Sequence, residues 1–218
     1  MKSTIKKTIV TALSLAFIVC FSTGCALFGF DASGYVKACL DANMHGEFDE
    51  YASITNSSVE EVEQLYNDFL DDDLSFLKEY NINEEKSQQF RELFINLYKK
   101  TQYEVGEATK ESDGAYTVPV TVHKMIIFKS VMETLEDDMT AWSESQVSSG
   151  TTPSMDEIYA YVVDYMYDKI SAEVDNPTYD EPETKTVKVA KNSSNVYMID
   201  QTELQNLFES LIDIENAE

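Results

Sequence analysis

Three stretches in the first half of the chain repeat apolar residues every three or four positions, which predicts amphipathic helices. The first begins at Ser33. A Ser-Val-Glu-Glu capping box at Ser58 opens the second helix, and Asn83 caps the third. Each helix would bury a single face, so we expect the three to pack on a common apolar surface.

The period then changes from three or four to two. Between residues 102 and 123 the pattern predicts two strands around a Ser-Asp-Gly turn, and Pro119 restricts the second strand to a sheet edge or a bulge. Residues 184–199 predict another hairpin, with its turn at residues 192–195. An isolated hairpin is only marginally stable, so the two hairpins are expected to join in one sheet.

Two helical patterns separate the hairpins and form a predicted insert at residues 128–177. The first runs from about Phe128 to Glu144. The second opens with a capping box at Ser154 and ends at Asn176-Pro177. A last helix follows Asp200 as cap, with Glu203 completing the box. We therefore predict an α+β fold: N-terminal helices packed on a curved antiparallel sheet of two hairpins, with a helical insert.

The first 24 residues predict a secretory signal. A lysine-rich start precedes an apolar run at residues 9–21, which is shorter than the roughly 20 residues that a membrane-spanning helix needs. Ser22-Thr23-Gly24-Cys25 resembles the lipobox of bacterial lipoproteins. The resemblance implies cleavage before Cys25, a palmitate-type lipid on its thiol, a lipidated tether at residues 25–32 and a single domain at residues 33–218. Ordinary secretion, with Cys25 incidental, is the alternative.

Charge excludes some partners. The chain carries 40 acidic residues against 16 basic ones, a formal net charge of −24. This balance argues against nucleic acid, whose phosphates require clustered cations, and against adhesion of the protein body to anionic lipids. The acidic surface suits either a solvated exterior or calcium binding. Runs such as Asp71-Asp72-Asp73 lack the spacing of a calcium loop, so we expect no metal site.

Candidate catalytic groups are few. After processing, Cys39 is the remaining thiol, and it is expected to be a small buried hydrophobe. His45 lies six residues further along the same helix and points elsewhere, while His123 falls on the polar face of a strand. No hydrolase, metalloprotease, phosphate-loop or Cys-x-x-Cys motif is present. We therefore expect no catalytic residues and no cofactor.

The order of elements across residues 33–214 resembles the cone-shaped α+β folds of the cystatin-like or nuclear-transport-factor-like kind, and in particular uncharacterised lipoproteins of Gram-positive bacteria that carry such a domain. The resemblance implies a pocket between the first helix and the curved sheet. It also implies attachment to the extracytoplasmic face of the cell membrane.

Aromatic residues of the insert form a candidate contact surface. Trp142, Tyr161 and Tyr165 are residue types that dominate protein contacts, although tyrosine rings can equally cover core edges. The function expected from the sequence is a lipid-anchored, non-catalytic binding module for a small apolar ligand or a partner protein. The alternative is an enzyme that uses a pocket of the cone with a Tyr/Asp/Glu acid–base set.

Overall fold

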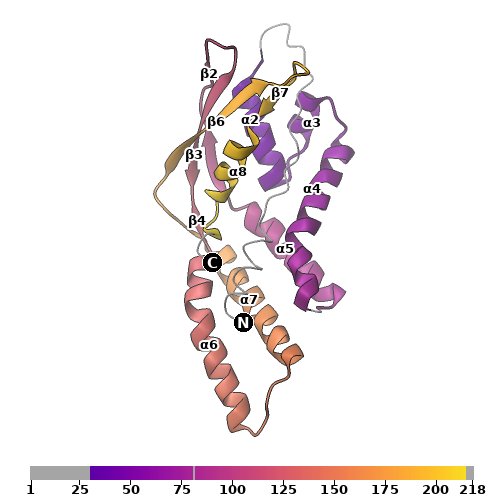
Figure 1. Ribbon diagram of the computed structural model, residues 1–218, viewed down its shortest axis with the longest axis vertical. Coiled ribbons are helices and arrows are strands. Elements are labelled where there is room, and N and C mark those ends of the chain that lie inside the picture. The colour runs from indigo at the N-terminus through magenta and orange to yellow at the C-terminus, as the bar shows by residue number, and fades with distance from the viewer. Residues whose placement is uncertain (1–29, 81, 215–218) are drawn as a thin grey trace.

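An antiparallel sheet forms one side of the molecule, helices cover one of its faces, and a pair of long helices projects from one end (Figure 1). The computed structural model describes residues 30–80 and 82–214. Within them it confirms the predicted α+β class, with helices packed against a curved sheet. The predicted signal peptide and Cys25 lie outside the described residues.

The two predicted hairpins meet in one sheet through their inner strands. The strand order is β1 (Gln102–Val105), β3 (Tyr116–His123), β6 (Glu183–Lys191) and β7 (Tyr197–Ile199), and β2 (Thr109–Lys110) also pairs with β3. Tyr116 stands opposite Val189, and Val122 stands opposite Glu183. A second small sheet joins β4 (Met125–Ile126) to β5 (Thr178–Tyr179).

Pro119 lies in a central strand, at a break between β1 and β2. Its carbonyl accepts a hydrogen bond from the Gly106 N–H (2.8 Å). In an antiparallel ladder a residue's N–H and C=O face the same neighbour, so the missing N–H of proline also falls at this break. A Cβ at Gly106 would lie 2.9 Å from the Pro119 ring, which explains the glycine. Strand β3 is central, so the edge alternative is wrong. The register of β3 with β1 and β2 shifts by one residue across the break, as at a bulge.

The first predicted helix is broken in two. Helix α2 (Ala32–Leu40) continues into a π-helical turn, η1 (Asp41–His45), and α3 (Asp49–Thr55) follows. Gly46, with a φ of 68°, ends η1 in the left-handed region that a glycine adopts without strain. The Ser33 hydroxyl in α2 donates to the Gly106 carbonyl and accepts from the Ala108 N–H, both at 2.8 Å. Helix α2 is therefore fixed to the break in the sheet.

The next helices start where the sequence predicts. The Ser58–Glu61 capping box opens α4 (Val59–Asp73), which runs into a 3₁₀ segment, η2 (Leu74–Tyr80). Asn83 caps α5 (Glu84–Tyr98) by accepting from the Lys86 N–H at 2.8 Å. Helices α4 and α5 both contact η1 and carry much of the aromatic part of the core.

The predicted insert is the projecting helical pair in Figure 1. It consists of α6 (Phe128–Ser148) and α7 (Met155–Asp175), and the Ser154–Glu157 capping box is formed. Helix α6 has no cap of its own. Asp213, near the end of the described chain, instead accepts from the N–H groups of Ile127, Phe128 and Lys129 at 2.8–2.9 Å.

Helix α8 (Gln201–Glu209) packs on the sheet, and its predicted capping box is half formed. The Asp200 carboxylate accepts from the N–H groups of Thr202 and Glu203, both at 3.0 Å. The Glu203 side chain does not accept the hydrogen bond from the Asp200 N–H that a complete capping box requires. Its carboxylate accepts from the Lys188 N–H on β6, and the Asp200 N–H donates to the Lys188 carbonyl. The box is replaced by contacts to a sheet edge that the local sequence does not reveal.

Candidate functional site

The space between α2 and the sheet is filled. Tyr35, Val36 and Cys39 of α2 have no exposed surface, nor do Val118 and Val187 of the facing strands. A cavity large enough for water would leave exposed surface on these side chains. The pocket that the cone-like resemblance implied is therefore closed by side chains at this position.

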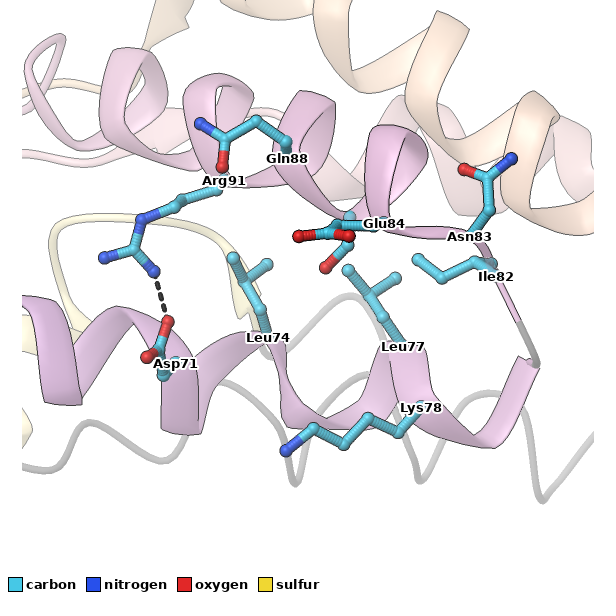
Figure 2. Close-up of a pocket in the computed structure, with 10 residues that line it drawn as sticks. Asp71, Leu74, Leu77, Lys78, Ile82, Asn83, Glu84, Gln88 and Arg91 are labelled. Carbon is cyan, nitrogen blue, oxygen red and sulfur yellow. Dashed lines mark hydrogen bonds and ion pairs between the residues drawn. The ribbon is translucent and has the colours of Figure 1, made fainter.

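A cleft opens elsewhere, between η2 and α5 (Figure 2). Its volume is about 590 Å³. Leu74, Leu77 and Ile82 supply its apolar part, with Lys78 and Arg91 as cations. The Arg91 guanidinium is already held, because it donates to the Asp71 carboxylate and to the Asn67 side chain. The remaining lining residues are polar or acidic: Asn83, Glu84, Ser87 and Gln88.

A second cleft of about 360 Å³ adjoins the first and shares Ile82 and Asn83 with it. Helix α7 forms its far wall. Lys86 of α5 bridges it, with its ammonium 2.7 Å from the Asp164 carboxylate and 4.9 Å from the Tyr167 ring centre. Both clefts are open and mixed in polarity. They suit a small amphipathic molecule better than the purely apolar ligand expected from the sequence.

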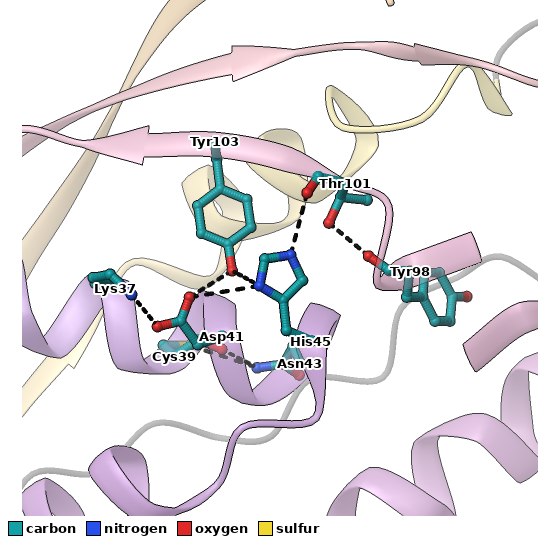
Figure 3. Close-up of polar contacts among 8 residues, drawn as sticks. All are labelled: Lys37, Cys39, Asp41, Asn43, His45, Tyr98, Thr101 and Tyr103. Carbon is teal, nitrogen blue, oxygen red and sulfur yellow. Dashed lines mark hydrogen bonds and ion pairs between the residues drawn. The ribbon is translucent and has the colours of Figure 1, made fainter. Parts of the chain in front are cut away.

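The most connected polar cluster joins η1 to β1 (Figure 3). The Tyr103 hydroxyl donates to Asp41 Oδ1 at 2.7 Å and lies 3.2 Å from His45 Nδ1. The His45 Nε2 atom lies 3.2 Å from the Thr101 carbonyl. A carbonyl only accepts, so Nε2 carries the proton in this contact. Lys37 completes the cluster by pairing with the other oxygen of Asp41.

This cluster has the residue types of an acid–base site but uses them on one another. Burial, followed by the hydrogen bond to Asp41, raises the pKa of Tyr103 above its usual value. Its proton is thus held by the carboxylate beside it. The His45 and Tyr103 rings stack with centres 5.1 Å apart, and this contact further fixes the orientation of the imidazole ring. The hydrogen bonds of Tyr103 link the π-helical turn η1 to strand β1. Turns of this kind are frequent at functional sites.

Cys39 is buried beside this cluster, as the sequence predicted. The Asn43 amide donates to the Cys39 carbonyl at 2.7 Å and contacts its sulfur at 3.7 Å. His123, at the end of β3, stands opposite Gln102 of β1 in the sheet. Its neighbour Val122 points into the core, so the His123 side chain points to the opposite face.

Sequence reasoning missed a buried acid between α4 and α5. Asp73 is 1% exposed and accepts a hydrogen bond from the Tyr98 hydroxyl. Its other oxygen has no hydrogen-bond partner, and neither does the buried Tyr66 hydroxyl. Burial raises the pKa of Asp73 to about 7, with the Tyr98 hydrogen bond opposing the shift and the nearby Asp72 adding to it. Burial also raises the pKa of Tyr66 to about 12.

A periodic signal for Asp73 was present. Val62, Tyr66 and Phe69 mark the buried stripe of α4 at spacings of four and three, and Asp73 continues that stripe four residues later. Its place in the Asp71-Asp72-Asp73 run hid it, because such runs usually face solvent. Asp71 and Asp72 do so here, and Asp73 does not.

The structure brings together the three aromatic residues predicted as a contact surface, but they differ in exposure. The Trp142 and Tyr161 rings stack across α6 and α7 with centres 4.5 Å apart, and both are partly exposed. Tyr165 is buried between the helices, and its hydroxyl lies 2.6 Å from that of Thr134. Tyr165 thus holds the helical pair together, while Trp142 and Tyr161 present surface to solvent.

The described residues show neither a metal-binding cluster nor a membrane-spanning helix. Residues 30–80 and 82–214 contain no group of three or more His, Cys, Asp or Glu side chains placed to hold a metal ion. Over the same ranges, no helix combines the length and the apolar character that crossing a bilayer requires.

Comparison with known proteins gives one structural likeness. No family model matches the chain, and no curated protein matches its sequence. The crystal structure of ycdA, a candidate lipoprotein from Bacillus subtilis, is similar to it with a TM-score of 0.56 and 17% sequence identity. The match covers 84% of this chain and 56% of that protein. The chain therefore spans little more than half the length of its neighbour, and at this identity the likeness shows the fold.

Proposed function

We propose that this protein is a lipid-anchored extracytoplasmic lipoprotein that acts as a non-catalytic binding module, and that a partner protein contacts its projecting α6–α7 hairpin. The anchor rests on the lipobox-like Ser22-Thr23-Gly24-Cys25 segment. The description of the structurally similar Bacillus subtilis protein as a candidate lipoprotein supports it. The proposal places the chain on the outer face of the cell membrane of a Gram-positive bacterium.

One observation carries the binding role. The α6–α7 hairpin projects from the body of the molecule (Figure 1). It holds the Trp142–Tyr161 stack in a partly exposed position. Stacked aromatic side chains give a large contact area at a low entropy cost, because their rotamers are already fixed. The filled space between α2 and the sheet removes the pocket that would have favoured ligand binding inside the cone.

The cleft of Figure 2 supports a second candidate, the binding of a small amphipathic molecule. Leu74 and Leu77 would contact its apolar part, and Lys78 would attract an anionic group. An enzymatic role would draw on the Asp41–Tyr103–His45 cluster. The contacts within that cluster support a structural clamp, since the Tyr103 proton is directed at Asp41.

The anchor is tested by replacing the proposed lipid attachment site. The Cys25→Ala variant should lose incorporation of radiolabelled palmitate and leave the membrane fraction, or stay as an uncleaved precursor. Cys20→Ala is the matched control, because Cys20 lies within the segment that processing would remove. It should label like the natural sequence. Equal palmitate labelling of Cys25→Ala and the natural protein would overturn the anchor.

A further inference from the structure

The tether of the proposed lipoprotein joins the body at an aromatic cluster. Phe30 stacks on Tyr197 with ring centres 3.9 Å apart and contacts Tyr116 and Tyr35 at 5.8 and 5.5 Å. Phe30 is five residues after Cys25, so an extended chain between them reaches about 18 Å at most. A lipid on Cys25 would therefore hold this cluster within that distance of the membrane surface.

Lysines surround this cluster. The Lys110 ammonium lies 5.7 Å from the centre of the Tyr116 ring, and that of Lys191 lies 5.0 Å from the Tyr197 ring. Both lysines are exposed, and both tyrosines are partly exposed. Tyrosine and lysine side chains, with apolar bodies and polar ends, are typical of the zone where a protein meets lipid headgroups.

The opposite end of the molecule has the opposite character. The two sheet turns, residues 109–116 and 188–197, contain three lysines and two carboxylates, and one of these lysines, Lys188, pairs with Asp113 at 3.6 Å. The α6–α7 hairpin, residues 128–175, contains eleven carboxylates and two lysines. The anionic lipids of a bacterial membrane would repel the hairpin and attract the lysines of the turns. Strand β3 runs from the turn at Tyr116 toward the start of α6, so the sheet separates the two ends (Figure 1).

We infer that the sheet end formed by Phe30, Tyr116, Tyr197, Lys110 and Lys191 is a contact surface for anionic lipid headgroups, and that it orients the α6–α7 hairpin away from the membrane. This inference rests on the proposed anchor at Cys25. It adds a surface that contacts lipid directly to an otherwise acidic body. The distance along β3 is about 23 Å, and that along α6 to Trp142 is about 21 Å. The Trp142–Tyr161 stack is thereby presented to partners far from the lipid surface.

The chain provides its own reporter, because Trp142 is the single tryptophan in the sequence. The full lipidated protein is reconstituted on phosphatidylglycerol vesicles that contain dansyl-labelled phosphatidylethanolamine as an energy acceptor. Trp142 emission should be almost unaffected by the acceptor. The double variant Trp142→Phe/Ser112→Trp moves the reporter to the exposed β2–β3 turn, and its emission should be strongly quenched. Tyr197→Trp in the Trp142→Phe background places a second reporter beside the tether.

The lipid contact itself is tested by charge reversal with the reporter at residue 112. Lys110→Glu/Lys191→Glu should reduce energy transfer, whereas the matched control Lys99→Glu/Lys100→Glu, at the far end of the sheet, should not. Equal transfer from both reporter positions, or stronger transfer from Trp142, overturns the orientation. Unchanged transfer after reversal of Lys110 and Lys191 overturns the headgroup contact. Protein that fails to float with the vesicles overturns the anchor as well.

Discussion

Asp73 is a buried acid whose ionisation opposes folding. Its pKa is raised to about 7 by burial, compared with about 4 for an exposed aspartate. Below pH 7 the protonated form of Asp73 therefore predominates in the folded chain. The contribution of Asp73 to the free energy of unfolding should be fully present below pH 4, fall as the pH rises toward 7, and be lost above that. Three pKa units correspond to about 4 kcal/mol of stability lost over this range.

Asp73→Asn should remove most of this pH dependence. An amide oxygen can still accept from the Tyr98 hydroxyl, and it carries no charge to desolvate. We expect the variant to melt at a higher temperature than the natural protein at pH 8 and close to it at pH 5, as followed by circular dichroism. Asp72→Asn is the matched control, because Asp72 is exposed. If both variants change the melting temperature equally at pH 8, the effect reflects net charge rather than burial.

At the scale of elements, starts of helices were easier to predict than their interruptions. The Ser58, Asn83 and Ser154 caps are local signals and are confirmed. The break in the first helix was not predicted, because apolar spacing continues through Met44 and Phe48 across it. Its stabilising partner, Tyr103, lies 58 residues beyond His45. Local periodicity cannot report a contact over that separation.

Contacts between distant residues also decide the candidate sites. The aromatic residues of the hairpin could be selected by type, but their exposure depends on which helix faces meet. The cleft between η2 and α5 depends on how an irregular segment follows α4. Asp73 is the exception, since its spacing from Phe69 places it on a buried stripe in the sequence itself.

The α6–α7 hairpin divides into a packed base and an exposed tip. Buried residues of α6 end at Leu135, and those of α7 begin at Val162. Replacing residues 144–153 with a short Gly/Ser loop keeps the Ser154 cap and should therefore leave the melting temperature nearly unchanged. Replacing residues 130–175 would remove buried apolar side chains of both helices and should prevent folding.

Partner contact at the hairpin is tested on an intact fold. A photoreactive side chain at position 142 or 161 should crosslink to a partner on the cell surface. The matched control is position 65, since Leu65 is an exposed apolar residue on α4, 47% accessible. Crosslinking from position 65 but not from 142 or 161 would contradict the hairpin as contact surface. Tyr165 is unsuitable for this test, because its burial between the helices makes substitution destabilising.

At the scale of the whole molecule, the proposed membrane contact and the proposed partner contact lie along one axis. The tether meets the sheet at Phe30, and the insert leaves the sheet at its other end (Figure 1). The core between them is continuous, from the valines of β3 and β6 to the aromatic residues of α4 and α5. In the proposed function, a filled core of this kind would act as a rigid spacer between membrane and partner, and this role would need no internal pocket.

The contacts made by residues 183–213 bear on the export that the predicted signal implies. Strand β3 pairs along its length with β6, for example Tyr116 with Val189, so this pairing requires residues 183–191. The N-terminus of α6 is capped by the side chain of Asp213. A chain that crosses a membrane N-terminus first would lack these contacts until residue 213 has crossed, so we expect the sheet and α6 to stay unfolded until then. This delay favours passage through a narrow translocation channel. Chains stalled before residue 183 should be digested by added protease, and chains released after residue 213 should resist it.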